Sequence, residues 1–298
     1  MRNDELYSNL LDRFNSELKI LNDKPEETAL STLKALWLAA SGQYISAQAA
    51  EHEILPELNT EQTEDLLKLI ERRFAGEPLA HLTGRQQFMG IELLAGPEAL
   101  VPRKETELLS KTAIEYLNNI SKEQDSLTVI DVCTGAGNLA ISYAVNEPKA
   151  KIYAADLSPE AVSLAKKNAE YHNLESQVKF TESDLLAAYE SPLFYNKVDL
   201  LTCNPPYISS GKVGIMDEEI SSHEPSLAFD GGPFGIKILQ QLMKEAPKYL
   251  REGGCLMFEL GLGQGELIIQ RIKKMNQYKE VLPVKDTNGD IRVVVACV

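Results

Sequence analysis

Asn204, Pro205, Pro206 and Tyr207 are the residues of this sequence best suited to chemistry, and they directly follow the mainly apolar run 198–203. The two prolines fix φ and have no backbone N–H. The carboxamide oxygen of Asn204 and the carbonyl of Pro205 therefore form an edge that only accepts hydrogen bonds. An NH2 group of an amide or an aromatic amine would satisfy this edge with both its hydrogens, and Tyr207 can stack on the same planar group. The alternative interpretation is a proline turn that ends a strand.

A second group of residues is typical of a turn that binds a ligand with its backbone. The apolar run 127–132 is followed by Gly135 and Gly137, which can turn the chain tightly and let a ligand approach. Asp156 ends the next predicted strand, 19 residues beyond Gly137, where a carboxylate can accept both ribose hydroxyls of an adenosine. The turn is shorter than a dinucleotide-binding GxGxxG turn, which favours a cofactor without a pyrophosphate. The alternative is an ordinary turn with a surface aspartate.

Asp184 follows the third predicted strand and has two interpretations. It is placed where the amino group of an adenine would need an acceptor. It also precedes the run Leu-Leu-Ala-Ala, where an aspartate suits the N-cap of a helix. Both interpretations remain open at this point.

The elements around these residues alternate between strand and helix from about residue 104 onward. A helix over Glu105 to Leu117 comes first, and later helices begin at Asn138, Ser158, Gly235 and Gly265. The predicted strands are 127–132, 151–156, 178–183, 198–204, 253–260, 278–284 and 291–297. This alternation predicts an α/β fold with a mostly parallel sheet covered on both faces. Sheets of this kind bind ligands at the carboxyl ends of their strands, where the strand order reverses.

The first 84 residues instead predict a small helical bundle. Apolar residues recur at helical spacing between Leu10 and Leu21 and between Leu30 and Trp37. Pro25, followed by two glutamates, fits a helix start. A third helix is expected over Thr60 to Phe74, and residues 85–101 read as a hairpin or an extended linker.

Composition and charge exclude several classes of protein. With 298 residues, 44% hydrophobic and 25% charged, the chain fits two globular domains. The net charge of -14 disfavours binding to a nucleic-acid backbone. The chain has neither a membrane-spanning apolar run nor a signal peptide, so we expect a cytoplasmic protein. Its four cysteines and four histidines are scattered, which indicates neither a metal site nor a disulfide framework.

The candidate catalytic and cofactor-binding residues, taken together, resemble the pattern of a known family. Asn204 to Tyr207, taken with the glycine turn and Asp156, resembles the class I S-adenosylmethionine-dependent methyltransferases that modify planar nitrogens. Three further segments narrow this resemblance to one subfamily: 77–84, 100–107, and 223–232 with Gly235. They look like the protein-(glutamine-N5) methyltransferases that act on peptide chain release factors. The resemblance runs from about residue 75 to the end of the chain, and that family also has a helical N-terminal domain.

The resemblance implies a fold, a cofactor and a reaction. The fold would be a Rossmann-like, seven-stranded, mostly parallel sheet at 104–298, preceded by a helical substrate-recognition domain at 1–84 and a hairpin linker at 85–103. S-adenosyl-L-methionine would supply a methyl group to the side-chain nitrogen (N5) of a glutamine, in the family that of a Gly-Gly-Gln loop. We expect a monomer whose partner is a peptide chain release factor, with no membrane and no nucleic acid as partner.

The resemblance also implies which residues form the site. The catalytic residues would be Asn204, Pro205, Pro206 and Tyr207. The cofactor would contact Asp131, Cys133, Thr134, Gly135, Ala136, Gly137, Asp156, Leu157, Asp184, Leu185 and Asn204. The substrate would contact Phe88, Arg103, Glu107, Asn204, Pro205, Tyr207, His223 and Glu224. No residue is expected to bind a metal.

Several substrate residues have structural alternatives. Arg103 and Glu107 also fit an ordinary helix start, and Phe88 also fits core packing. The stretch from Ser209 to Gly235 is interpreted as a lid over the substrate, with a surface loop as the alternative. His223, within this stretch, is a candidate general base.

The sequence departs from the family pattern in three places. Cys133 stands where the family usually has glycine, Asn138 follows the turn, and Leu185 stands where some members have an aromatic residue near the adenine. Cys133 leaves the acceptor open. A relative that methylates a ribosomal-protein glutamine has a similar cysteine, so a ribosomal protein or a small metabolite is an alternative acceptor. Adenine-N6 transfer shares the chemistry of Asn204 to Tyr207 but needs base flipping and phosphate contacts. A non-catalytic cofactor-binding module is the remaining class.

Overall fold

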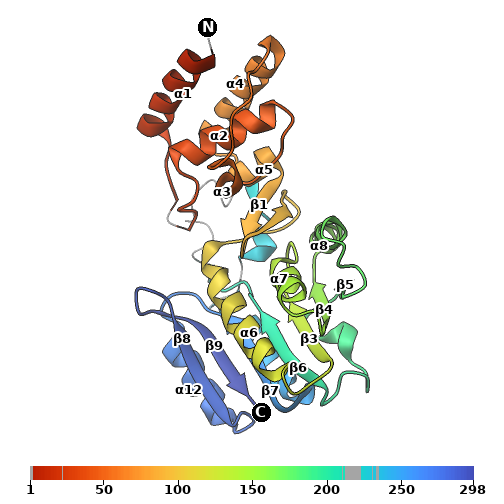
Figure 1. The fold of residues 1–298 in the computed structure, drawn as a ribbon. Coiled ribbons are helices and arrows are strands. Elements are labelled where there is room, and N and C mark those ends of the chain that lie inside the picture. The colour runs from red at the N-terminus through yellow and green to blue at the C-terminus, as the bar shows by residue number, and fades with distance from the viewer. Residues whose placement is uncertain (1–2, 22, 210, 212–222, 230, 233–234) are drawn as a thin grey trace. The chain divides into compact units, whose positions relative to one another are not determined.

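The computed structural model describes residues 3–21, 23–209, 211, 223–229, 231–232 and 235–298 (Figure 1). The chain divides into two compact units, Met1–Glu105 with Asp217–Glu224, and Thr106–Met216 with Pro225–Val298. The expected domain boundaries after residues 84 and 103 stay a prediction. In this division the hairpin belongs to the first unit, together with a short segment from much later in the chain.

The first unit is a bundle of helices with a two-stranded hairpin. Its elements are α1 (Asn3–Glu17), α2 (Ala29–Ala40), α3 (Ala47–Ala50), α4 (Thr60–Phe74), α5 (Leu79–Thr83), β1 (Arg85–Phe88) and β2 (Ile91–Leu94). The strands pair antiparallel, as the glycine-broken apolar runs predict. Phe14, Trp37, Leu66 and Ile70 belong to one buried core. This core is separate from the core of the second unit.

The helix starts follow the capping residues. The predicted helix Thr60 to Phe74 is confirmed as α4, whose first turn is closed by a capping box between Asn59 and Gln62. The predicted helix start at Pro25 is wrong, because α2 begins at Ala29. Thr28 is its N-cap, and its hydroxyl accepts the backbone N–H of Ser31 at 3.1 Å.

The second unit confirms the predicted α/β fold. Its strands are β3 (Leu127–Val132), β4 (Ala150–Asp156), β5 (Val178–Glu182), β6 (Val198–Cys203), β7 (Leu250–Glu259), β8 (Glu280–Lys285) and β9 (Ile291–Cys297). They form one 7-stranded sheet in the order β5-β4-β3-β6-β7-β9-β8. The first five strands of that order are parallel, and β9 pairs antiparallel with both β7 and β8.

The helices of the second unit cover both faces of the sheet. They are α6 (Glu107–Ile120), α7 (Asn138–Asn146), α8 (Pro159–Tyr171), α11 (Lys237–Glu245) and α12 (Gly265–Met275). Short 3-10 turns occur at Lys104–Thr106, Ala187–Tyr189, Ser226–Ala228 and Ala246–Lys248. In Figure 1, α6 lies in front of the sheet and α12 behind it. Within the described part of the chain, no helix has the length and apolar character needed to cross a membrane.

The strand order reverses between β3 and β6. These strands are neighbours, with Val132 opposite Cys203, although β4 and β5 lie between them in the sequence. The residues that follow β3 and β6 therefore lie side by side at the carboxyl edge of the sheet. This is the reversal point at which open α/β sheets bind ligands.

The cysteines correct one expectation from the sequence. Cys255 and Cys297 lie directly opposite each other on β7 and β9, with their Cα atoms 4.1 Å apart, and form a disulfide. The two cysteines are 42 residues apart in the sequence, so their spacing does not predict the pairing. Only the strand register brings them together.

A buried ion pair in the first unit gives a stability prediction. Arg73 and Glu27 are paired at 2.9 Å, with side chains 3% and 2% exposed. Glu27→Gln removes the carboxylate but leaves the buried guanidinium, so we expect the free energy of unfolding of the protein to fall by about 3 kcal/mol in chemical denaturation.

Glu71→Gln is the matched control, because it breaks an exposed pair with Arg13 on the same helical bundle. Its loss should be much smaller, since solvent already screens that pair. Equal losses in the two variants would show that burial does not govern the strength of the Glu27 pair.

A candidate active site at the carboxyl edge of the sheet

The turn after β3 has three residues in the left-handed backbone region. They are Cys133, Gly135 and Gly137, with φ of 56°, 54° and 82°. A Cβ at Gly137 would lie 3.0 Å from the ring of Phe180, so only glycine fits. A Cβ at Gly135 would meet no described atom within 4 Å, which leaves open space beside that backbone. The predicted glycine turn is thus shaped for close approach of a ligand.

The positive φ of Cys133 explains why its position favours glycine. A side chain in the left-handed region costs about 1 kcal/mol relative to glycine. Leu185, another departure from the family pattern, also has a positive φ, 47°. Its side chain is buried in the core of the second unit, at 6% exposure. The thiol of Cys203, which contacts Cys133, is buried as well, and burial raises its pKa well above the ordinary value.

Asp131 braces the glycine turn from inside the protein. Its side chain is fully buried, and its two carboxylate oxygens accept hydrogen bonds from the hydroxyls of Thr134 at 2.6 Å and Thr202 at 2.7 Å. Burial raises the pKa of Asp131 to about 7, although both hydroxyls act in the opposite direction. Asp131 therefore links the turn after β3 to strand β6.

Asp156 lies at the end of β4 and holds the same turn from the other side. Its carboxylate accepts the backbone N–H of Gly135 at 2.8 Å and that of Ser158 at 3.0 Å. Burial raises the pKa of Asp156, and these N–H groups oppose the shift. The next residue, Leu157, is 52% exposed although it is apolar. A carboxylate with remaining lone pairs beside an exposed apolar side chain suits a ribose and an adenine.

The helix-cap interpretation of Asp184 is wrong. The hydroxyl of Ser183 accepts the backbone N–H of Ala188 at 2.9 Å, so the neighbouring serine caps this turn. Asp184 itself is exposed. Its role as an acceptor for an adenine amino group stays a prediction.

Asn204 directly follows β6 and is oriented by a residue on another element. Its Nδ2 donates a hydrogen bond to the hydroxyl of Thr106 at 3.0 Å. Within the described residues, Oδ1 of Asn204 and the carbonyl oxygen of Pro205 accept no hydrogen bond from the chain. The Asn204 amide is thus held at its nitrogen, and the acceptor edge that it would form with Pro205 stays a prediction.

Tyr207 is fixed by residues of β7 and the loop after it. Its hydroxyl donates to Oε1 of Glu259 at 3.2 Å, and its backbone carbonyl accepts Nε2 of Gln264 at 3.1 Å. Glu259 is 2% exposed and pairs with Arg292 at 3.7 Å. A Cβ at Gly261 would lie 3.0 Å from the Tyr207 ring, so the ring packs directly against the Gly261 backbone.

Glu224, which was expected to contact the substrate, is occupied inside the first unit. Its carboxylate accepts Nη2 of Arg103 at 2.6 Å and the backbone N–H of Val101 at 3.0 Å, and its side chain is fully buried. Asp23 also pairs with Arg103, at 3.2 Å. Burial lowers the pKa of Arg103, but the carboxylates of Glu224 and Asp23 outweigh burial and the net shift is upward. These bonds fix the Glu224 carboxylate within the first unit, and its contact with the substrate stays a prediction.

The other predicted substrate residues have mixed surroundings. Phe88 on β1 is 1% exposed, which agrees with its alternative as a core residue. His223 is half-buried. Glu107, in the second unit, is buried in the first turn of α6 and pairs with Lys111 at 3.1 Å. Most of the stretch from Ser209 to Gly235 lies outside the described residues, and so does the lid expected there.

Sequence reasoning missed four residues of the site: Thr106, Thr202, Glu259 and Gln264. Thr202 and Glu259 each left a signal, because a polar residue near the carboxyl end of an apolar strand needs a partner there. Thr106 belongs to the quoted segment 100–107 but was not given a role. Gln264 left no signal that spacing could reveal.

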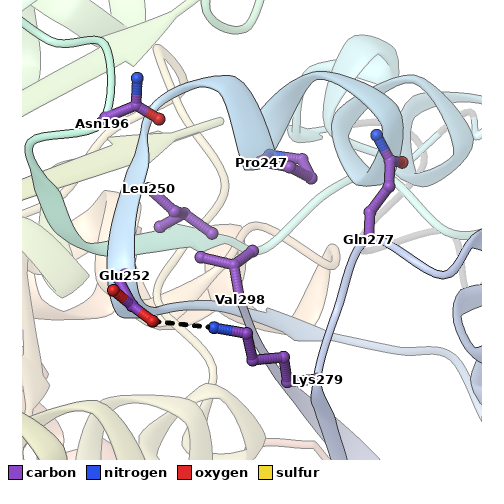
Figure 2. Close-up of a pocket in the computed structure, with 7 residues that line it drawn as sticks. All are labelled: Asn196, Pro247, Leu250, Glu252, Gln277, Lys279 and Val298. Carbon is purple, nitrogen blue, oxygen red and sulfur yellow. Dashed lines mark hydrogen bonds and ion pairs between the residues drawn. The ribbon is translucent and has the colours of Figure 1, made fainter.

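A separate surface pocket lies at the opposite edge of the sheet. It encloses about 400 Å³ and is lined by Asn196, Pro247, Leu250, Glu252, Gln277, Lys279 and Val298. Figure 2 shows the ion pair between Lys279 and Glu252, which measures 3.1 Å. Leu250 begins β7, whereas the predicted site residues follow the carboxyl ends of strands. In the described part of the chain, no three His, Cys, Asp or Glu side chains are grouped so that they could hold a metal ion.

Comparison with known proteins gives one consistent result. A family model described as "Methyltransferase domain" matches residues 123–294, more than half of the chain. The release factor glutamine methyltransferase of Moorella thermoacetica is 36% identical over 76% of this chain and 77% of its own length. That of Deinococcus radiodurans is 38% identical over 76% of both chains.

The solved structures agree at the level of the fold. The human methyltransferase 10 domain-containing protein has a TM-score of 0.51 at 18% identity, and the match covers 81% of this chain and 98% of that one. The seven-stranded, mostly parallel sheet is thus a methyltransferase fold.

The buried Asp131 predicts a particular pH dependence. The unfolded chain releases this proton near pH 3.8, whereas the folded protein keeps it to about pH 7, so folding takes up a proton between these values. The free energy of unfolding therefore falls as pH rises through this window, by at most about 1.4 kcal/mol per pH unit.

In Asp131→Asn this contribution is absent. Denaturant titrations at pH 5 and pH 8 should show the variant gaining stability relative to the wild type, and a constant difference would contradict the burial effect.

Proposed function

Because this chain belongs to the release factor glutamine methyltransferase family, we propose that it transfers a methyl group from S-adenosylmethionine to a glutamine side chain of a peptide chain release factor. In this proposal the acceptor is the N5 nitrogen of the glutamine in a Gly-Gly-Gln loop. The observation that carries the proposal is the acceptor edge of Asn204 and Pro205, with the Asn204 nitrogen already bonded to Thr106.

The residues around the glycine turn fit S-adenosylmethionine. Asp156 has acceptor capacity for the ribose hydroxyls, the exposed Leu157 offers an apolar surface for the adenine, and Asp184 offers an exposed carboxylate for its amino group. Gly135 leaves open space beside the backbone for the rest of the ligand. Cys133, Thr134, Ala136, Gly137 and Leu185 shape the same turns. When bound, S-adenosylmethionine supplies an electrophilic methyl group on a sulfonium.

The chain's own groups orient the glutamine amide. An amide nitrogen is a weak nucleophile, because its lone pair is delocalised into the carbonyl, so alignment matters more than prior deprotonation. Oδ1 of Asn204 and the carbonyl of Pro205 accept the two N–H bonds, and both oxygens stabilise the positive charge that develops on nitrogen. The nitrogen gains the methyl group as its bond to sulfur breaks, S-adenosylhomocysteine is the leaving group, and one N–H proton passes to water. Pro206 stiffens the edge, and Tyr207, held by Glu259, packs against the planar amide. Correct alignment can supply ~7–11 kcal/mol of the barrier.

The finer assignments are part of the same proposal. Phe88, Arg103, Glu107, His223 and Glu224 are assigned to the substrate side. The bonds of Glu224 to Arg103 and Val101 orient its carboxylate. The partner is a release factor rather than nucleic acid, in keeping with a net charge of -14. The enzyme acts as a monomer in the cytoplasm, where translation takes place.

A transfer assay tests the proposed acceptor directly. The purified protein is incubated with S-adenosylmethionine carrying a labelled methyl group and, separately, with a release factor, a ribosomal protein and duplex DNA. Mass spectrometry of the labelled product should locate the methyl on the glutamine of the Gly-Gly-Gln loop. Label on the ribosomal protein or the DNA alone would reject the release factor as acceptor, and no transfer to any of them would reject the function.

Asn204→Ala should abolish turnover and leave cofactor binding nearly intact. The amide oxygen acts mainly on the charge that develops during transfer, and loss of one such group costs ~10²-fold in kcat or more. Steady-state kinetics with the release factor measures kcat, and calorimetry with S-adenosylhomocysteine measures cofactor affinity. Asn146→Ala, on the exposed end of α7, is the control. A variant with more than about a tenth of wild-type kcat would oppose the assigned role.

Asp156→Ala should mainly weaken cofactor binding. It removes the carboxylate that accepts the ribose hydroxyls and the N–H of Gly135. Hydrogen bonds to a charged group contribute about 1.5–3 kcal/mol, so the Kd for S-adenosylhomocysteine should rise at least about tenfold in calorimetry. Asp125→Ala removes an exposed aspartate before β3 and should leave Kd unchanged. An unchanged Kd in Asp156→Ala would remove Asp156 from the cofactor site.

A further inference from the structure

Thr106 is the last residue of the 3-10 turn Lys104–Thr106, which runs directly into α6. It has helical dihedrals, φ -65° and ψ -18°, and its side chain makes no capping hydrogen bond. Its hydroxyl accepts Nδ2 of Asn204 at 3.0 Å. The hydroxyl of a residue at the start of this helix therefore serves the predicted catalytic amide.

The surroundings shield this bond from water. Thr106 is 1% exposed, so water does not compete for its hydroxyl. Thr106 and Asn204 are 98 residues apart in the sequence and both belong to the second unit. Helix α6 packs against β6, the strand that ends just before Asn204. The start of α6 therefore meets the residue that follows β6.

The orientation of the Asn204 amide decides whether it can accept a substrate N–H. With Nδ2 bonded to Thr106, Oδ1 is the atom left for the substrate. A rotation of the amide by half a turn would exchange the two atoms and present an NH2 group to the NH2 group of the glutamine. Two donors repel each other, so the rotated amide cannot align the substrate.

We propose that Thr106 is a positioning residue for the methyl transfer: its hydroxyl holds Nδ2 of Asn204 and thereby presents Oδ1 to the glutamine amide. The inference rests on the proposed function and extends it to a residue that does not touch the substrate. Thr106 acts through Asn204 alone, so its loss lowers kcat and leaves cofactor binding unchanged.

Two substitutions at Thr106 separate the hydroxyl from the shape of the side chain. Thr106→Val keeps the branched shape and removes the hydroxyl, whereas Thr106→Ser keeps the hydroxyl. In Thr106→Val we expect kcat with the release factor to fall about tenfold, as for the loss of one ordinary hydrogen bond in the transition state. KM, the Kd for S-adenosylhomocysteine and the melting temperature should stay near the wild-type values. Thr106→Ser should restore most of kcat.

Thr112→Val is the matched control on the same helix. The hydroxyl of Thr112 donates to the carbonyl of Leu108 at 2.8 Å, so this variant removes a hydroxyl of α6 that does not reach Asn204. Its kcat should equal that of the wild type. A fall as large as that of Thr106→Val would show a general effect on the helix and overturn the inference.

A double variant tests whether Thr106 acts through Asn204. Thr106→Val on the Asn204→Ala background should leave the residual labelled-methyl transfer unchanged, because the amide to be positioned is gone. A further tenfold loss would mean an independent role, and wild-type kcat in Thr106→Val alone would mean no role. A rise in kcat would mean that the hydroxyl holds Oδ1 instead. If the wild-type protein transfers no labelled methyl to the release factor, the proposed function fails. If it does so and only Thr106→Val keeps wild-type kcat, the positioning role alone fails.

Discussion

The carboxylate of Asp131 is the interaction on which the rest of the site depends. One of its oxygens binds Thr134 in the glycine turn and the other binds Thr202 on β6, two residues before Asn204. A single buried group therefore ties the candidate cofactor turn to the strand that carries the candidate catalytic amide. Burial of a carboxylate is costly, which its raised pKa records. Two hydroxyl donors offset part of this cost and set the distance between the two halves of the site.

The same design recurs at each polar group of the site. Asn204 is bonded to Thr106, Tyr207 to Glu259, and Asp156 to the backbone N–H of Gly135. Asn204 is held at its nitrogen and Tyr207 at its hydroxyl, whereas both carboxylate oxygens of Asp156 accept a backbone N–H and keep further lone pairs for a ligand. Groups that are already oriented lose little freedom when the ligand binds, and they can stabilise a developing charge without reorganising. Reaction at a weakly nucleophilic amide depends on this kind of preorganisation.

Backbone geometry adds a second constraint to the cofactor turn. Cys133, Gly135 and Gly137 all have positive φ, and at Gly137 the ring of Phe180 leaves no room for a side chain. Cys133 shows that a small side chain is accepted at its position at a modest cost in backbone energy.

The sequence by itself determined the alternation of strands and helices, the glycine turn and the acceptor edge of Asn204 and Pro205, because each is a local property of residue type and spacing. It also carried the family resemblance. Only the tertiary structure decided that β3 and β6 are neighbours, that Thr106 holds Asn204, that Glu224 is bonded to Arg103, and that Cys255 meets Cys297. These pairings join residues distant in the sequence. They follow from strand order and register, which cooperative burial of the whole core selects and which no local pattern encodes.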